Sequence, residues 1–171
     1  MSLIHNVRML LLAAWLGAAI YFSAVVAPSA FGVLRSFGLP NASEIAGTIV
    51  TRTLSVVNTS GFLLSLLLLI TAFAFKKAFR RWSFILQLLL LTVVATATAI
   101  GEWVIAARMR GLRAAMHGQI DQVPLSDPNR LAFAALHGYS VAALGIAMIA
   151  ALLLILLMAA SREKEFHSHT T

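Results

Sequence analysis

Three ionisable residues interrupt long apolar stretches of this sequence, and they are the residues best able to do chemistry. Arg52, Glu102 and His137 supply a guanidinium, a carboxylate and an imidazole, and Tyr139 and Ser140 closely follow the histidine. Exposing a charged group to lipid costs about 2.5–3.5 kcal/mol, so such groups usually face the interior of a helix bundle and pair there. The sequence therefore predicts a polar cluster, provided that the surrounding elements bring these residues to one depth.

The imidazole of His137 has three interpretations. It could hydrogen-bond a neighbouring helix, ligate haem or a metal ion, or shuttle protons. A metal site needs several converging ligands, and a haem held between His5 and His137 is geometrically poor because these residues belong to opposite ends of the bundle. We therefore predict no metal site and no cofactor, with haem at His137 as the alternative. No catalytic motif is recognisable, which makes an enzyme the less favoured class.

The composition identifies the environment of these residues. Apolar residues make up 60% of the 171 positions and charged residues 11%, against roughly 45–50% and about 25% in soluble domains. Four apolar blocks exceed the roughly 20 helical residues that a bilayer requires. We expect an all-α integral membrane four-helix bundle with up-down-up-down topology. Its expected helices cover about 7–35, 43–76, 82–116 and 128–162, within one domain at 1–162 and before a polar tail at 163–171.

Charge and cysteine content narrow the partners. There is no cysteine, which excludes disulfides, thiolate metal sites and cysteine nucleophiles. The net charge of +7 does not indicate nucleic acid, because Lys and Arg beside membrane helices set orientation and contact anionic lipid. We expect the lipid bilayer as partner, with a homo-oligomer or a larger membrane complex as further possibilities. The four cations of "FKKAFRRW" favour cytoplasmic termini, in a bacterial cytoplasmic membrane.

Alternating helix direction predicts where the polar residues meet. Arg52 lies early in the second helix, Glu102 late in the third and His137 early in the fourth, so all three fall in the outer half of the bilayer. Pro28, late in the first helix, should free the carbonyl of Ala24 there. The opposite half is expected to be plain Leu, Ile, Val and Ala.

This convergence predicts an ion pair and a pocket. We expect Glu102 to pair with Arg52 and with an arginine of "ARMRGLR", in a pocket that admits a small polar or anionic molecule. An interfacial ion pair that only fixes the helix register is the alternative. Asp127 is expected to cap the fourth helix ahead of Pro128. Gly138, beside His137, is expected to let a neighbouring helix approach.

Four segments resemble, in order along the chain, the transmembrane-protein-205-like family. They are "AAWLGAAIYFSAVVAPSAFGVL", "AGTIVTRTL", "GEWVIAARMRGLRAAM" and "DPNRLAFAALHGYS", with the His-Gly-x-Ser at 137–140 as the most specific part. The resemblance covers about residues 8–155 and implies a four-helix membrane protein without an established reaction. A eukaryotic member is associated with resistance to a platinum drug, which implies transport or trafficking.

More distant relatives carry a further implication. The family is similar to copper-resistance membrane proteins and to a haem-binding protoporphyrinogen oxidase, which usually have a histidine in the first helix. Arg8 occupies the comparable place in this sequence, so a bis-histidine haem site is not carried over. The predicted function is a binding, transport-related or accessory role that uses the outer-half polar cluster. The alternatives are a haem- or metal-binding redox membrane protein and an accessory subunit of a larger membrane complex.

Overall fold

The chain folds into long helices, as the composition predicts. The computed structural model describes residues 2–74, 81–116, 118 and 120–168, with the backbone alone for residues 2 and 161–168. Four helices are long and apolar enough to cross a membrane, which confirms the all-α four-helix architecture. Lys76, Lys77 and Arg80, which carry much of the orientation argument, lie outside the described residues.

Two of the four spans are continuous α-helices and two contain a π-helical turn. The first span comprises α1 (Ser2–Tyr21), the π turn η1 (Phe22–Val26) and α2 (Ala27–Ser36). The second is α3 (Ala42–Ala74). The third comprises α4 (Arg81–Ala99), the π turn η3 (Ile100–Ala106) and α5 (Ala107–Ala115). The fourth is α6 (Pro128–Ser168), which continues past residue 162, where a polar tail was expected to begin.

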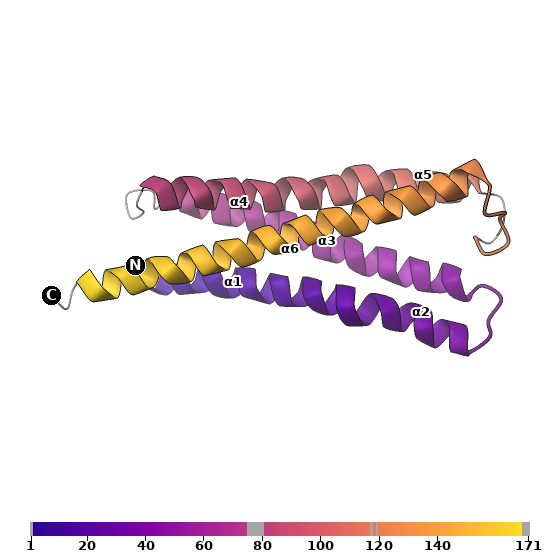
Figure 1. Cartoon of the computed structure of the whole chain (residues 1–171), viewed down its shortest axis with the longest axis horizontal. Coiled ribbons are helices and arrows are strands. Elements are labelled where there is room, and N and C mark those ends of the chain that lie inside the picture. The colour runs from indigo at the N-terminus through magenta and orange to yellow at the C-terminus, as the bar shows by residue number, and fades with distance from the viewer. Residues whose placement is uncertain (1, 75–80, 117, 119, 169–171) are drawn as a thin grey trace.

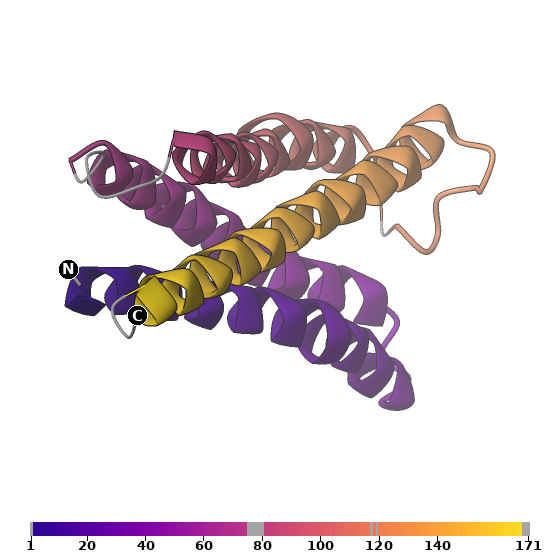
Figure 2. The same ribbon diagram turned by 60° about the vertical axis from the view of Figure 1, so that its left-hand side comes forward.

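The spans alternate in direction. Both termini lie at one end of the bundle, which we call the terminal end, and the connections 37–41 and 116–127 lie at the opposite loop end (Figure 1). Helix α4 packs against α3 and α6, and α1 packs against α6 and α3. Figure 2 shows α6 crossing the other helices diagonally and diverging from α2 toward the loop end. The topology is therefore up-down-up-down, and the helix pairs separate toward the loop end.

A tryptophan fixes the contact between α1 and α3. Trp15 is buried in the core and its Nε1 donates to the carbonyl oxygen of Val57 at 3.0 Å. Gly61 lies beneath the ring, and a Cβ added there would be 2.6 Å from Cζ2 of Trp15. Only glycine leaves room for the indole, so this residue sets how closely the two helices approach.

The two π turns have different sequence contexts. In η1 the N–H of Ala27 donates to the carbonyl of Phe22, five residues back, directly before Pro28 in the first turn of α2. The proline lacks an N–H, so the helix widens where the i−4 bond cannot form. The turn η3 has no proline and contains Glu102. Because a π turn holds an additional residue, side chains beyond it point to different faces than in a regular helix.

Candidate functional site

Glu102 is the centre of the candidate site. The residue is 8% exposed, although it carries a carboxylate in an apolar span. Its Oε1 accepts a hydrogen bond of 2.9 Å from Oγ of Ser55, and Nη1 of Arg110 lies 3.8 Å from the same oxygen. Its Oε2 is buried and has no hydrogen-bond partner within the part of the chain that the structure describes. One carboxylate oxygen is therefore engaged, and the other has no donor among the described residues.

Asn58 provides a second buried polar group, which lies against Gly101, the residue before Glu102. The side chain is 3% exposed, and a Cβ added at the neighbouring Gly101 would lie 3.1 Å from Nδ2 of Asn58. The absence of a side chain at Gly101 thus lets the amide contact η3 directly. We call Ser55, Asn58 and Glu102 the Glu102 cluster.

The cluster lies well inside the bundle, measured from the loop end. Ser55 is 13 positions from the start of α3 and Glu102 is 13 from the end of α5. Buried Ser140 is 12 positions from the start of α6. At 1.5 Å per residue each is about 18–20 Å from the loop end. Ser55, Glu102 and Ser140 therefore lie at a similar level along the bundle.

The structure distributes the five predicted site residues between the interior and the surface. Glu102 and Ser140 are buried, whereas Arg52, His137 and Tyr139 are exposed. The expected contact of Glu102 with an arginine of "ARMRGLR" is found at Arg110. Glu102 and Arg52 form no ion pair in the described residues.

Helix geometry explains the position of Arg52. Three residues turn an α-helix about 60° short of a full circle, so Arg52 lies about 120° round from the buried Asn58, with Ser55 between them. On α6 the buried face contains Ser140. His137 is three residues earlier, so it is displaced from this face by about 60°. Gly138 has nothing within 4 Å of an added Cβ, so the predicted helix approach at this residue is wrong.

The terminal half contains a polar cluster that the sequence interpretation missed. Arg8 is 4% exposed, and its Nη2 donates to the carbonyl of Leu68 at 3.3 Å and to Oε1 of Gln87 at 3.5 Å. Gln87 is fully buried and donates to Oγ of Ser83 at 3.4 Å. The expectation of a plain apolar half is wrong, because Arg8 joins α1, α3 and α4. The lone glutamine in "ILQLLLL" was the available signal.

His5 and His137 are too far apart to share a haem. Nε2 of His5 donates to the carbonyl of Met158 at 3.2 Å. Met158 lies 21 positions along α6 from His137, which is about 31 Å of helix. No group of three or more His, Asp or Glu residues that could hold a metal ion occurs within the described ranges.

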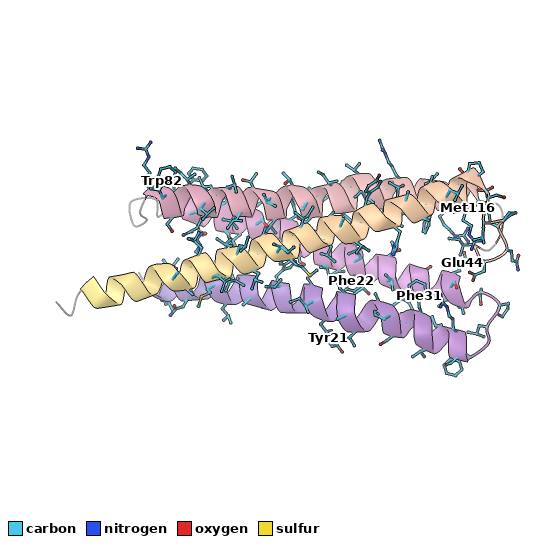
Figure 3. All side chains as sticks on the ribbon, in the orientation of Figure 1. Tyr21, Phe22, Phe31, Glu44, Trp82 and Met116 are labelled. Carbon is cyan, nitrogen blue, oxygen red and sulfur yellow. The ribbon has the colours of Figure 1, made fainter. Side chains whose placement is uncertain are left out.

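The loop end is fastened by local and long-range contacts. Nη2 of Arg113 lies 2.5 Å from Oε1 of Glu44, which ties α5 to the start of α3 (Figure 3 labels Glu44). Oδ1 of Asp127 accepts from the backbone N–H groups of Asn129 and Arg130 at 2.8 and 3.1 Å. The predicted cap of the fourth helix is confirmed.

Comparison with known proteins yields one match. A family model described as "Domain of unknown function (DUF4149)" matches residues 10–118, which include α1 through α5 apart from the first residues of α1. No curated protein and no solved structure matches the chain. The matched range contains all three members of the Glu102 cluster.

Proposed function

Because the chain belongs to the family described as "Domain of unknown function (DUF4149)", we propose a function from the geometry of the Glu102 cluster. The protein is an integral membrane protein that binds a small monovalent cation, inorganic or ammonium, at Glu102. Its role is related to transport and includes no catalytic step.

The buried Oε2 of Glu102 carries this proposal. A buried acceptor left without a partner costs about 1–3 kcal/mol, and more when it is charged. Ser55 occupies only Oε1, and no described side chain donates to Oε2. A bound cation, or an ammonium group that donates to Oε2, removes this cost. We therefore place the cation at Oε2, where it would supply the missing partner.

The charge of the cluster favours a monovalent cation. Glu102 contributes a single negative charge, and Ser55 and Asn58 contribute neutral oxygen atoms. Divalent cations are usually held by several carboxylates, which this cluster does not have. An anion is disfavoured because the buried charge is itself negative, while the side chain of Arg110 is 55% exposed.

Arg110 supplies the counter-charge while the site is empty. Its guanidinium lies 3.8 Å from Oε1, which is beyond good hydrogen-bond distance. An arginine that is half in solvent and held by Coulomb attraction alone can withdraw when a cation arrives. The bound cation then replaces the guanidinium, so a positive charge neutralises the carboxylate of Glu102 both before and after binding.

The orientation of the protein follows as part of the proposal. We place both termini in the cytoplasm and the loop end outside, in a bacterial cytoplasmic membrane, because the connection between α3 and α4 concentrates positive charge. A transport-related role also agrees with the resemblance to the transmembrane-protein-205-like family.

Thermal stability in the presence of different cations tests the proposal. Detergent-purified protein is melted in NaCl, KCl, methylammonium chloride or N-methylglucamine chloride at one ionic strength. We expect a saturable rise in Tm with at least one of the three small cations relative to N-methylglucamine. Glu102→Gln should abolish this rise, and Glu44→Gln, which alters a glutamate at the loop end, should retain it. Equal Tm values in all four salts, or a rise retained by Glu102→Gln, would refute cation binding at this residue.

A further inference from the structure

The spans are much longer than a bilayer is thick. Helix α3 has 33 residues, which is about 50 Å at 1.5 Å per residue. The hydrocarbon core is about 30 Å thick, and a typical tilt of about 20° lengthens the path by only about 2 Å. About a third of each span must therefore lie outside the hydrocarbon, and its position can be read from the aromatic and charged residues.

Exposed aromatic residues mark two levels on the bundle. Trp82 and Trp103 are 76% and 52% exposed, and the 21 positions between them span about 31 Å. Trp and Tyr gather at the two membrane–water interfaces. Tyr139 on α6 and Tyr21 on the first span are also exposed. Each lies about 20 positions from the point where the apolar part of its own span stops at the terminal end of the bundle. In Figure 3, Trp82 lies at the terminal end, whereas Tyr21 lies between the two ends and points away from the bundle.

The positions of the charged residues agree with the same two levels. The region between the levels comprises residues 2–21, 54–74, 82–103 and 139–159. Its formal charges are Arg8 and Glu102, and both are buried inside the bundle. Glu102 lies one position inside the second level, and the other charged residues of the loop half lie beyond it, in 22–53 and 104–138. Aromatic positions and charges therefore independently select the same slab of about 30 Å.

Three exposed residues lie just outside this slab on the loop side. Arg52 is three positions beyond Ser55, His137 two beyond Tyr139, and Arg108 five beyond Trp103, distances of about 3–8 Å along the helices. The side chains of Arg52, Arg108 and His137 are exposed, and none forms an ion pair with a described carboxylate. This is the depth of the phosphate groups in a phospholipid leaflet.

We infer that Arg52, Arg108 and His137 bind the phosphate groups of anionic phospholipids, and that the bundle projects about 20 Å beyond the hydrocarbon slab at its loop end. Guanidinium groups bind phosphate in two-pronged geometry, and an imidazole N–H donates to its oxygens. The inference also explains why Arg52 and His137 face outward, since at headgroup depth their exposure meets phosphate and water instead of acyl chains. It is independent of any ligand at Glu102.

Fluorescence quenching tests the slab. Trp82→Phe and Trp103→Phe variants, each retaining buried Trp15, are reconstituted with lipids brominated near the headgroup or near the chain end. We expect the lipid brominated near the headgroup to quench Trp82 and Trp103 at least two-fold more strongly. Stronger quenching of either residue by bromine near the chain end would place it at the bilayer centre and overturn the assignment.

Lipid-dependent melting tests the phosphate contacts. The protein is melted in detergent containing phosphatidylglycerol, phosphatidylcholine or inorganic phosphate. We expect phosphatidylglycerol to raise Tm most, and the double variant Arg52→Gln/Arg108→Gln to lose at least half of that rise. Arg35→Gln is the matched control, because Arg35 lies 14 positions beyond Tyr21, about 21 Å above the slab. An equal rise with inorganic phosphate, or an equal loss in Arg35→Gln, would exclude headgroup binding at Arg52 and Arg108.

Discussion

The hydroxyl of Ser55 on α3 donates a 2.9 Å hydrogen bond to Oε1 of Glu102 in the π turn η3. This bond holds the carboxylate of the third span against the second span and leaves Oε2 buried without a partner. The relationship therefore has two parts, a structural tie through one oxygen and a potential ligand site at the other. Substitutions of Ser55 and of Glu102 test the structural tie and the ligand site separately.

Ser55→Ala should destabilise the protein by about 1–3 kcal/mol, because it leaves a buried carboxylate without its neutral donor. The free energy of unfolding is measured by titrating a denaturing detergent into mild-detergent micelles. Ser60→Ala is the control on the same helix, since exposed Ser60 donates to the carbonyl of Val57 within that helix. We expect Ser60→Ala to change stability by less than about 0.5 kcal/mol. Equal changes in the free energy of unfolding would show that the hydrogen bond to Glu102 stabilises the protein no more than the bond made by Ser60 does.

Gly61→Ala should destabilise the bundle by about 1–3 kcal/mol, because the new methyl overlaps the indole of Trp15. The indole cannot move away freely while it donates to Val57. Gly47→Ala in the same helix meets nothing within 4 Å, and it should be neutral or stabilising by up to about 1 kcal/mol. Helical content against temperature, followed by circular dichroism, distinguishes the two variants. A stable Gly61→Ala protein would mean that Trp15 is not fixed in this position.

The sequence predicts the position of a residue along the bundle better than it predicts the direction in which its side chain points around the helix. The number of spans, their alternation and the level of Glu102 follow from segment lengths, and the Asp127 cap follows from neighbouring residues. These helices are apolar on most sides, so no polar face indicates which side is turned to lipid. For this reason the expectation that Arg52 and His137 face the interior is wrong, because the helix turns both side chains outward.

The contacts of Arg8 could not have been predicted by local rules. Its acceptors come from α3 and α4, residues 60 and 79 positions away, and they are defined only once three helices pack together. The π turn at Glu102 could not be predicted either, because the sequence has no proline there. This turn rotates the side chains of α5 relative to those of α4. The sequence thus identified Glu102 and an arginine of its segment, but not which arginine.

Arg8→Ala should destabilise the protein by at least about 2 kcal/mol, because it removes hydrogen bonds from a buried guanidinium to Leu68 and Gln87. The exposed Arg81 is the matched control at the same end of the bundle. Arg81→Ala should remain within about 0.5 kcal/mol of the unaltered protein. Detergent unfolding followed by tryptophan fluorescence measures both. An Arg8→Ala protein as stable as Arg81→Ala would show that the buried contacts do not hold the helices together.

The pair formed by Glu44 and Arg113 should contribute about 0.2–1 kcal/mol, since both side chains are partly exposed. A double-mutant cycle with Glu44→Gln and Arg113→Gln isolates this coupling energy. We expect the coupling to weaken as the salt concentration rises, because the surrounding water and ions screen the pair. A coupling energy that is unchanged between low and high salt would indicate that the loop end is closed to solvent.

Equilibrium binding of radioactive sodium or rubidium to the purified protein is the most direct test of the role given to Glu102. The account predicts one saturable cation per chain, lost in Glu102→Gln and kept in Glu44→Gln, with tighter binding in Arg110→Gln because the competing guanidinium is gone. Binding of the same stoichiometry and affinity in Glu102→Gln, or no saturable binding of sodium, rubidium or a methylammonium probe to the unaltered protein, would contradict it.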